Sequence, residues 1–178
     1  MTRASTTGPT HAGSMDDFLE VINPQAPVVG DSEIEIAAPL EVVWDVLTAL
    51  DSWPSWNPDV KWMARQGKVA VGSTFRWKAG PGTITSIIRR VEKPRLIAWT
   101  GKTLGIRAIH RYRLEPRGEG TFVRTDESYE GLIAGLFRVP LRKTLNSALA
   151  SGLQSLRTEA ELQATADPID GDAADSAT

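Results

Sequence analysis

One histidine lies among strand-forming residues in the stretch GIRAIHRYRLEP, residues 105–116, and it is a candidate for acid–base chemistry. Side chains alternate between the two faces of a β-strand, so His110 shares a face with Ala108 and Tyr112. The other face carries three arginines: Arg107, Arg111 and Arg113. Because arginine is rarely buried without a partner, that face is predicted to meet water and His110 to point inward.

A carboxylate on the next predicted strand can reach this histidine. In TFVRTDESY, residues 121–129, Glu127 lies on the more apolar face. A four-residue loop RGEG between the strands would pair His110 with Glu127, whereas a two-residue turn would pair His110 with Thr125. In either register the imidazole and the carboxylate share one face, about 5 to 8 Å apart between β-carbons.

Such a pair has three possible uses, and the residues alone leave all three open. It could act as the general base that removes an acidic C–H proton in an aldol cyclisation, with Tyr112 as a polar partner. It could instead orient a hydroxyl or carbonyl of a ligand, or the two groups could satisfy only each other. The carboxylate would raise the pKa of the imidazole and burial would lower it. Ser128 faces away from His110, so it is not a candidate nucleophile.

The composition excludes several other kinds of site. The chain has 178 residues and no cysteine, which suits one domain without disulfides or thiolate chemistry. With two histidines a histidine-based zinc site is not expected, and GPGT at 80–83 does not match a nucleotide-binding loop. We therefore predict no metal and no cofactor. The arginines alternate along the strands, which indicates a solvent-exposed face and not a nucleic-acid interface.

No apolar run approaches the roughly 20 residues of a membrane span, and the first 15 residues lack the apolar segment of a signal peptide. We expect a soluble, cytoplasmic protein with no integral membrane association. Its oligomeric state is not indicated.

The elements that position the pair follow from hydrophobic periodicity. SEIEIAA (32–38) alternates as a strand does, and PLEVVWDVLTAL (39–50) has helical spacing behind a proline. The proline-rich DSWPSWNPDV that follows allows only a short helical turn, which Asn57 caps. Six further strands are predicted, joined by short turns: VKWMAR, STFRWKA, GTITSIIRRV, LIAWTG, GIRAIHRYRLEP and GTFVRTDESYEG. A long helix then runs from Pro140 to Leu162 with leucines along one face.

These elements predict an α+β domain over residues 31–164, with a flexible extension at 1–30 and a disordered acidic tail at 165–178. A single helix must cover about seven antiparallel strands, so the sheet should curve around it and enclose a cavity. Gly152, in the middle of the helix, could leave room for a ligand.

The order of elements and several local motifs resemble a known superfamily. The matching pieces are the strand leading into the proline-started helix, the WPSWNP turn at 53–58, FRWKAGPGTITS at 75–86, AWTG at 98–101 and DESYEG at 126–131. They are similar to the START-like, or Bet v 1-like, superfamily (SRPBCC), whose bacterial members include polyketide cyclase/dehydrase and lipid transport proteins. The resemblance implies a helix-grip fold, with a deep apolar cavity between the curved sheet and the C-terminal helix.

Residues on the inward faces are then candidate contacts to a small hydrophobic molecule. For the tryptophans, core packing is the competing interpretation, and Trp53 and Trp56 could simply anchor the short turn. The candidate ligand-binding residues are Phe75, Trp77, Trp99, His110, Tyr112, Glu127, Tyr129, Gly152 and Trp56.

Three functions are compatible with this arrangement. The first is a protein that binds or carries an aromatic, polyketide-like or lipid-like compound. The second is a polyketide cyclase or dehydratase with His110 and Glu127 as its catalytic acid–base pair. The third is a protein-interaction module of the co-chaperone or toxin type with a vestigial cavity. An inward arginine, expected in a cyclase, is missing unless Arg89 turns inward at a bulge.

Overall fold

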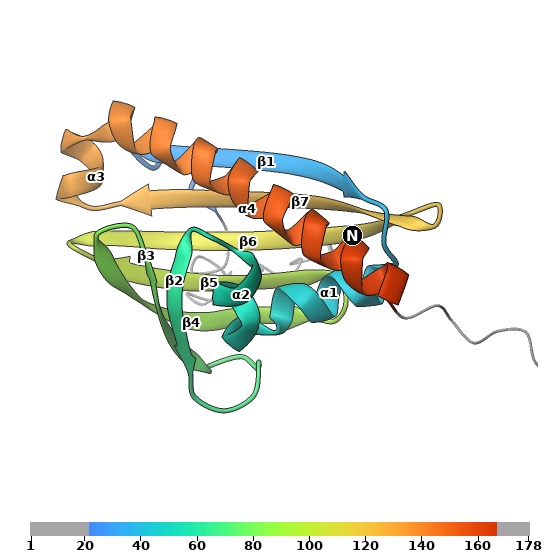
Figure 1. Ribbon diagram of the computed structural model, residues 1–178. Helices are drawn as coiled ribbons and strands as arrows, with labels where there is room; N and C mark the ends of the chain where they lie inside the picture. Colours follow the sequence, from blue (N-terminus) through green and yellow to red (C-terminus); the bar gives the residue numbers. More distant parts are fainter. Residues whose placement is uncertain (1–21, 167–178) are drawn as a thin grey trace, which may run out of the picture.

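The computed structural model describes residues 22–166, which form one curved antiparallel sheet gripped around a long helix (Figure 1). Residues 1–21 of the predicted extension and residues 167–178 of the predicted acidic tail lie outside the described residues. The strand order is β1-β7-β6-β5-β4-β3-β2. The strands are β1 (Val28–Ile36), β2 (Val60–Arg65), β3 (Thr74–Ala79), β4 (Gly82–Glu92), β5 (Leu96–Thr103), β6 (Ile106–Arg117) and β7 (Gly120–Glu130). The predicted α+β helix-grip fold with seven strands is confirmed.

The helices lie on the concave side of the sheet and at its ends. They are α1 (Leu40–Thr48), the 3-10 turn η2 (Leu50–Ser52), α2 (Trp53–Trp56), α3 (Leu132–Leu136) and α4 (Arg138–Ala166). Pro39 precedes α1 at its N-cap, as the sequence predicts. Asn57 follows α2, where its side-chain oxygen accepts a hydrogen bond from the Asp59 amide at 3.1 Å. No helix among residues 22–166 is long and apolar enough to cross a membrane.

The start of β1 and the presence of α3 differ from the sequence prediction. β1 starts at Val28, earlier than predicted, because Val28 and Val29 still pair with the end of β7. Gly30 lies inside this strand where α4 crosses it, and a β-carbon there would clash with the Asn146 side chain. A glycine that looks like a strand breaker in the sequence is thus a close-packing position. The short helix α3 was not predicted.

Large side chains fill only one half of the space between sheet and helices. Near α1 the filling side chains include Ile36, Leu114, Val123, Leu153 and Leu156. Toward the other end of the sheet the inward positions are small, with Gly101 and Ala108 on the strands and Ala148 and Gly152 on α4. The fold therefore has a packed half and a hollow half.

The hairpin of β6 and β7 sets the geometry of the candidate pair. It turns through Gly118 and Glu119, with Arg117 paired to Gly120 and Gly118 at φ 61°. The turn is tighter than the four-residue loop considered from the sequence, but it keeps the same register, in which His110 pairs with Glu127.

Candidate functional site

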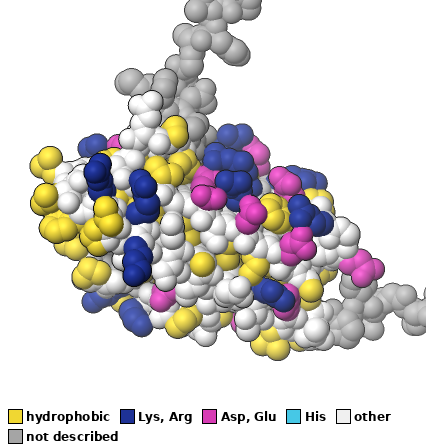
Figure 2. All heavy atoms as spheres, turned by 90° about the horizontal axis from the view of Figure 1, so that it is seen from above, with side chains coloured by type: hydrophobic (Ala, Val, Ile, Leu, Met, Phe, Trp, Pro, Cys, Tyr) yellow, Lys and Arg dark blue, Asp and Glu magenta, His cyan; other side chains and the backbone are white. Residues whose placement is uncertain are grey.

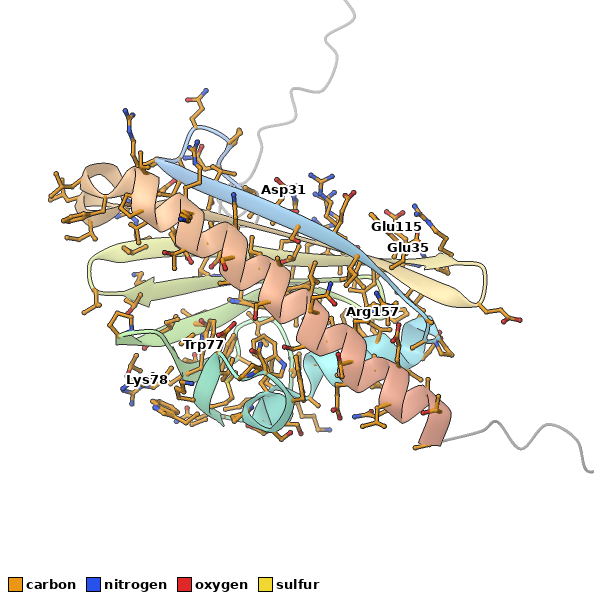
Figure 3. The ribbon with its side chains drawn as sticks, turned by 45° about the horizontal axis from the view of Figure 1, so that its top comes forward. Asp31, Glu35, Trp77, Lys78, Glu115 and Arg157 are labelled. Atoms are coloured by element: carbon orange, nitrogen blue, oxygen red, sulfur yellow. The ribbon has the colours of Figure 1, made fainter. Side chains whose placement is uncertain are left out.

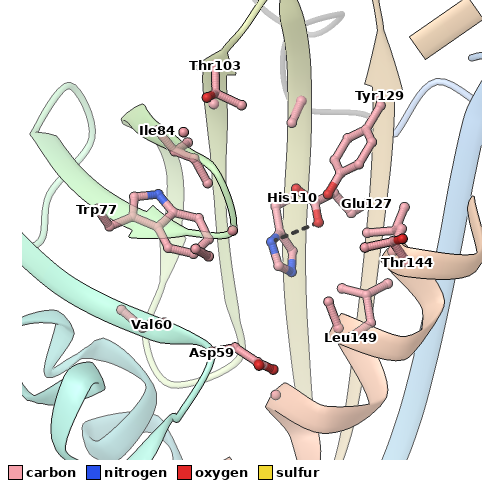
Figure 4. Close-up of a pocket in the computed structure, with 18 of the residues that line it drawn as sticks. Asp59, Val60, Trp77, Ile84, Thr103, His110, Glu127, Tyr129, Thr144 and Leu149 are labelled. Atoms are coloured by element: carbon pink, nitrogen blue, oxygen red, sulfur yellow. Dashed lines mark ion pairs between the residues drawn. The ribbon is translucent and has the colours of Figure 1, made fainter. Parts of the chain in front are cut away.

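A cavity of about 830 Å³ occupies the hollow half, between the concave face of the sheet and α4 (Figure 4). Its mouth is marked by exposed lining residues on two sides. One side is the start of β2 and the β3–β4 turn, with Lys61, Gly80 and Pro81, and the other is α4, with Thr144 and Ala148. Ligand pockets for small molecules span about 300 to 1,000 Å³, so the volume suits such a ligand.

The aromatic residues form the border between the cavity and the core. The ring of Trp99 lies 5.9 Å from that of Trp53 and 5.7 Å from that of Tyr112, between centroids. Trp77 lies further toward the mouth, and its indole N–H donates to the Ser86 hydroxyl at 3.0 Å. This wall is rigid, because each ring is held on several sides by other rings or by a hydrogen bond.

His110 and Glu127 lie side by side in the cavity wall, as the register predicts. The His110 Nδ1 atom is 3.5 Å from a carboxyl oxygen of Glu127, and both side chains are about one tenth exposed. Trp99 on β5 pairs with His110, and Gly30 on β1 pairs with Glu127. The four residues therefore form one row across the sheet.

The other nitrogen of His110 fixes the tautomer of the ring. His110 Nε2 is 2.8 Å from the hydroxyl of Thr125, which donates its own proton to the Arg111 carbonyl at 3.2 Å. Because a hydroxyl has one proton, Nε2 carries the hydrogen and donates to Thr125. The unprotonated Nδ1 then faces Glu127 and the cavity, and it has no hydrogen-bond partner among the described residues.

Burial sets the charge of this pair. It lowers the pKa of His110 to about 3 and raises the pKa of Glu127 to about 8. Of the two opposing influences on the imidazole pKa, the neighbouring carboxylate and burial, burial is therefore the stronger. At neutral pH the imidazole is neutral and the carboxyl is mostly protonated, so the cavity carries no buried charge at this point.

Two tyrosines extend the polar cluster. The Tyr129 hydroxyl is hydrogen-bonded to the Glu127 carboxyl, and its pKa is raised by burial and by the neighbouring Glu127. The pKa of Tyr112 is also raised, mainly by burial. Tyr112 stacks on His110 with ring centroids 4.8 Å apart. Both hydroxyls stay protonated at neutral pH and can donate hydrogen bonds.

Most of the predicted ligand-binding residues line the cavity, and two do not. Those that line it are Trp77, Trp99, His110, Tyr112, Glu127, Tyr129 and Gly152. Phe75 shares the face of Trp77 but is buried in the packed half, 5.8 Å from the ring of Trp99. Trp56 packs against Trp53, 6.0 Å between ring centroids, and lies behind the cavity wall.

Arg89 does lie at a β-bulge, between Ile88 and Arg90, as considered from the sequence. Its Nε nevertheless donates to the Thr100 hydroxyl at 3.2 Å, and Arg89 does not line the cavity. Among the residues that the structure describes, no arginine lines it. The inward arginine expected of a cyclase is therefore missing from this part of the chain.

Sequence reasoning missed two lining residues that matter. Trp53, taken as an anchor of the short turn, also forms part of the cavity wall, and its indole N–H donates to the Leu47 carbonyl at 2.9 Å. Thr103 lies near the end of β5, and its buried hydroxyl has no hydrogen-bond partner among the described residues. Strand alternation from Trp99 through Gly101 places Thr103 on the inward face, so the pattern contained this signal.

Solved structures with the same fold are numerous but distant in sequence. The hypothetical protein jhp0584 from Helicobacter pylori superposes with a TM-score of 0.72, at 13% identity, over 88% of this chain and 99% of that chain. A START superfamily protein from Mycobacterium smegmatis superposes with a TM-score of 0.59, at 17% identity, over 78% of this chain and 97% of that chain. The di-domain ARO/CYC protein StfQ from the steffimycin biosynthetic pathway gives 0.65, at 18% identity, over 78% of this chain and 53% of that chain.

No curated protein matches the sequence. At these identities the solved structures establish the fold alone, and this fold hosts several functions. The protein family described as polyketide cyclase / dehydrase and lipid transport matches residues 28–161, from the start of β1 to near the end of α4. The chain therefore belongs to this polyketide cyclase / dehydrase and lipid transport family, as its strand and turn motifs predict.

Proposed function

We propose that this protein binds a small, mainly apolar molecule of the aromatic, polyketide-like or lipid-like class in the cavity beneath α4. The observation that carries the proposal is a cavity of about 830 Å³ with an aromatic wall and few polar atoms. It far exceeds the roughly 300 Å³ below which a vestigial cavity would be favoured. The interaction-module alternative thus loses its main argument.

Two buried polar atoms support recognition of a ligand with a polar group. His110 and Thr103 line the cavity, and His110 Nδ1 and the Thr103 hydroxyl have no hydrogen-bond partner among the described residues. An unpaired buried polar atom costs about 1 to 3 kcal/mol, so a ligand hydroxyl or carbonyl that pairs with one of them gains affinity. The expected ligand is an apolar body with one or two oxygen atoms.

Ala148→Trp is expected to block this site, because Ala148 lines the mouth on α4 and an indole there would fill it. Ala150→Trp is the matched control, since Ala150 is exposed on the same helix and does not line the cavity. Titration with the fluorescent probe anilinonaphthalene sulfonate should show at least about tenfold weaker binding for the first variant and no change for the second. Equal binding by both variants would place the probe elsewhere and contradict the proposal.

Native mass spectrometry of freshly purified protein supplies the complementary test. A co-purified small molecule of the expected class should be bound by the unaltered protein and by Ala150→Trp, and lost from Ala148→Trp. Retention by Ala148→Trp would show that the molecule does not occupy the cavity.

A second candidate function is cyclisation of a poly-β-ketone chain, and the pKa of Glu127 favours it. A carboxylate with a pKa of about 8 is better matched to proton abstraction than an imidazole with a pKa of about 3. Ionised Glu127 would take a proton from the methylene group between two carbonyls, the enolate would add to a distant carbonyl carbon, and protonated Glu127 would return the proton to the resulting alkoxide. The Tyr129 hydroxyl, which donates its hydrogen bond to Glu127, would stabilise the ionised carboxylate.

For this function, Glu127→Gln is expected to lower the rate of cyclisation of a poly-β-ketone thioester by at least about 100-fold while probe binding is retained. Turnover by the unaltered protein should rise with pH through about 8, because Glu127 ionises there. The control is Glu130→Gln, which changes a carboxylate on the same strand that does not line the cavity. Unchanged turnover in Glu127→Gln would eliminate the cyclase mechanism and leave the binding proposal intact.

A further inference from the structure

One end of the molecule exposes an unusual number of large apolar side chains. Leu132 is 91% exposed and Leu136 is 75% exposed, although both belong to a helix of only five residues. We call this surface the apolar tip, and its residues are Leu104, Leu132, Ile133, Leu136, Phe137 and Val139. Within α3 only Ala134 is buried, so the helix presents most of its apolar side chains outward.

The residues of the apolar tip come from two segments that touch. The β5–β6 turn lies against α3, because a β-carbon at Gly105 would be 3.7 Å from the Ile133 side chain. Gly131 also approaches the Gly105 carbonyl so closely that a β-carbon there would clash. In Figure 1 both segments lie at the same end of the sheet, beyond β6 and β7. The apolar side chains thus form one surface and not scattered single residues.

Leu104 lies in this surface with a backbone conformation that leucine rarely adopts. Its φ is 44°, in the left-handed region, and it is 65% exposed at the top of the β5–β6 turn. A turn of this type favours asparagine, aspartate or glycine at that position. Turn geometry therefore does not account for a leucine here; its side chain packs over Gly82 on β4 and is otherwise exposed at the surface.

Basic side chains surround the apolar tip. Residues 102–107 and 130–143 hold five basic residues: Lys102, Arg107, Arg138, Arg142 and Lys143. The only acidic residue in these two segments is Glu130, which pairs with Arg107 at 3.4 Å. In Figure 2 hydrophobic side chains gather at the α3 end with basic side chains among them, whereas acidic and basic side chains lie together toward the other end. Glu35 and Glu115 lie toward the opposite end of the molecule (Figure 3).

We propose that the apolar tip docks onto an anionic lipid membrane surface, with its leucines and Phe137 among the acyl chains and the basic residues at the headgroups. Apolar side chains flanked by lysine and arginine are the arrangement that binds such a surface. A protein partner would need a complementary acidic rim, whereas an anionic bilayer supplies negative charge in every direction. The excess of basic residues around the apolar tip would orient this end of the molecule toward the membrane.

The docked orientation would bring the cavity to the membrane. Leu104 belongs to the apolar tip and also lines the cavity, and Leu141 and Lys143 line it from the first turns of α4. The proposal concerns a separate surface and stands even if the cavity binds no lipid. Binding of a soluble probe in the cavity should therefore be unaffected by changes at Leu132 or Leu136.

Insertion can be measured directly because the chain has no cysteine. Leu136→Cys and Leu162→Cys each give one attachment site for the fluorophore NBD, and Leu162 is a matched control because it is 63% exposed on the far part of α4. With vesicles of phosphatidylcholine containing about one third phosphatidylglycerol, the dye at position 136 should shift to the blue and the dye at 162 should not. Equal responses at both positions, or none at 136, would overturn the proposal.

Vesicle co-sedimentation tests the two parts of the surface separately. The double change Arg138→Glu and Arg142→Glu should weaken binding at least tenfold, since each basic residue at an anionic surface contributes about fivefold. Leu132→Ser with Leu136→Ser should weaken it similarly, and the controls Lys68→Glu and Leu162→Ser should not. Vesicles of phosphatidylcholine alone should bind less protein, and added salt should weaken binding to the anionic vesicles. If the unaltered protein instead forms dimers that the leucine variant abolishes, and ignores the vesicles, the apolar tip is a self-association surface and the proposal is wrong.

Discussion

Replacing Glu127 by glutamine is expected to raise the free energy of unfolding at pH 9 by about 3 to 5 kcal/mol and to leave it within about 1 kcal/mol of the original at pH 4. Removing a carboxylate from an imidazole would ordinarily weaken a protein. The opposite outcome is expected here because burial raises the pKa of Glu127 to about 8.

The sign follows from proton binding. Below about pH 4.5 the carboxyl is protonated in both the folded and the unfolded chain, so it contributes no pH dependence. Between about pH 4.5 and 8 the folded chain keeps the proton and the unfolded chain loses it, so stability falls as pH rises. Glutamine resembles the protonated carboxyl at all pH values because it stays uncharged and keeps an acceptor oxygen and a donor group.

The measurement is chemical denaturation of both proteins at several pH values from 4 to 9. The titration of His110 occurs in both proteins and largely cancels in the difference between them. Glu115→Gln serves as the control, because Glu115 is exposed on β6 and its replacement should shift stability by less than about 0.5 kcal/mol at every pH. A difference between wild type and Glu127→Gln that stays constant from pH 4 to 9 would mean that folding does not shift the pKa of Glu127.

Trp99→Ala is expected to lower the free energy of unfolding by about 3 to 5 kcal/mol. Trp99 is 2% exposed and lies where the packed half meets the cavity wall. Its ring contacts those of Trp53, Phe75, His110 and Tyr112. Removing it joins the cavity to the core, and the surrounding rings cannot collapse into the space without giving up their own contacts.

Urea or thermal denaturation measures this loss, with Trp62→Ala as the matched control. Trp62 is 37% exposed on the edge strand β2, so its removal should cost about 1 kcal/mol or less. Similar losses of unfolding free energy in the two variants would show that Trp99 contributes no more to stability than the partly exposed Trp62.

The face of each strand could be predicted from the sequence because alternation is a local property. Three arginines on one side of β6 were enough to turn His110 inward, and the same reasoning brought Glu127 to it across the hairpin. The position of a residue along the sheet is not local, which explains why Phe75 does not line the cavity. Phe75 and Trp77 share a face, but β3 runs from the packed half into the hollow half, and the border falls between them.

The charge of the His110–Glu127 pair could not be predicted from the sequence either. The pattern names an imidazole and a carboxylate with opposing influences, but the balance depends on how completely the neighbours exclude water. Here Trp99 and Tyr112 pack on the imidazole, and Glu127 is covered as well, so burial prevails for both groups. Similarly, α3 escaped prediction because it is a short helix whose apolar residues do not turn toward the core.

The separation of the molecule into a packed half and a hollow half has a consequence for how such a protein can diverge. The leucines of α4 that hold the helix to the sheet, Leu153 and Leu156, belong to the core, whereas Ser147, Ala148, Ser151 and Gly152 line the cavity. Substitutions in the second group change the size and polarity of the site without removing a core contact. Selection for a new ligand can therefore act on one set of positions while another set maintains folding, and variants with altered specificity need little compensating change elsewhere.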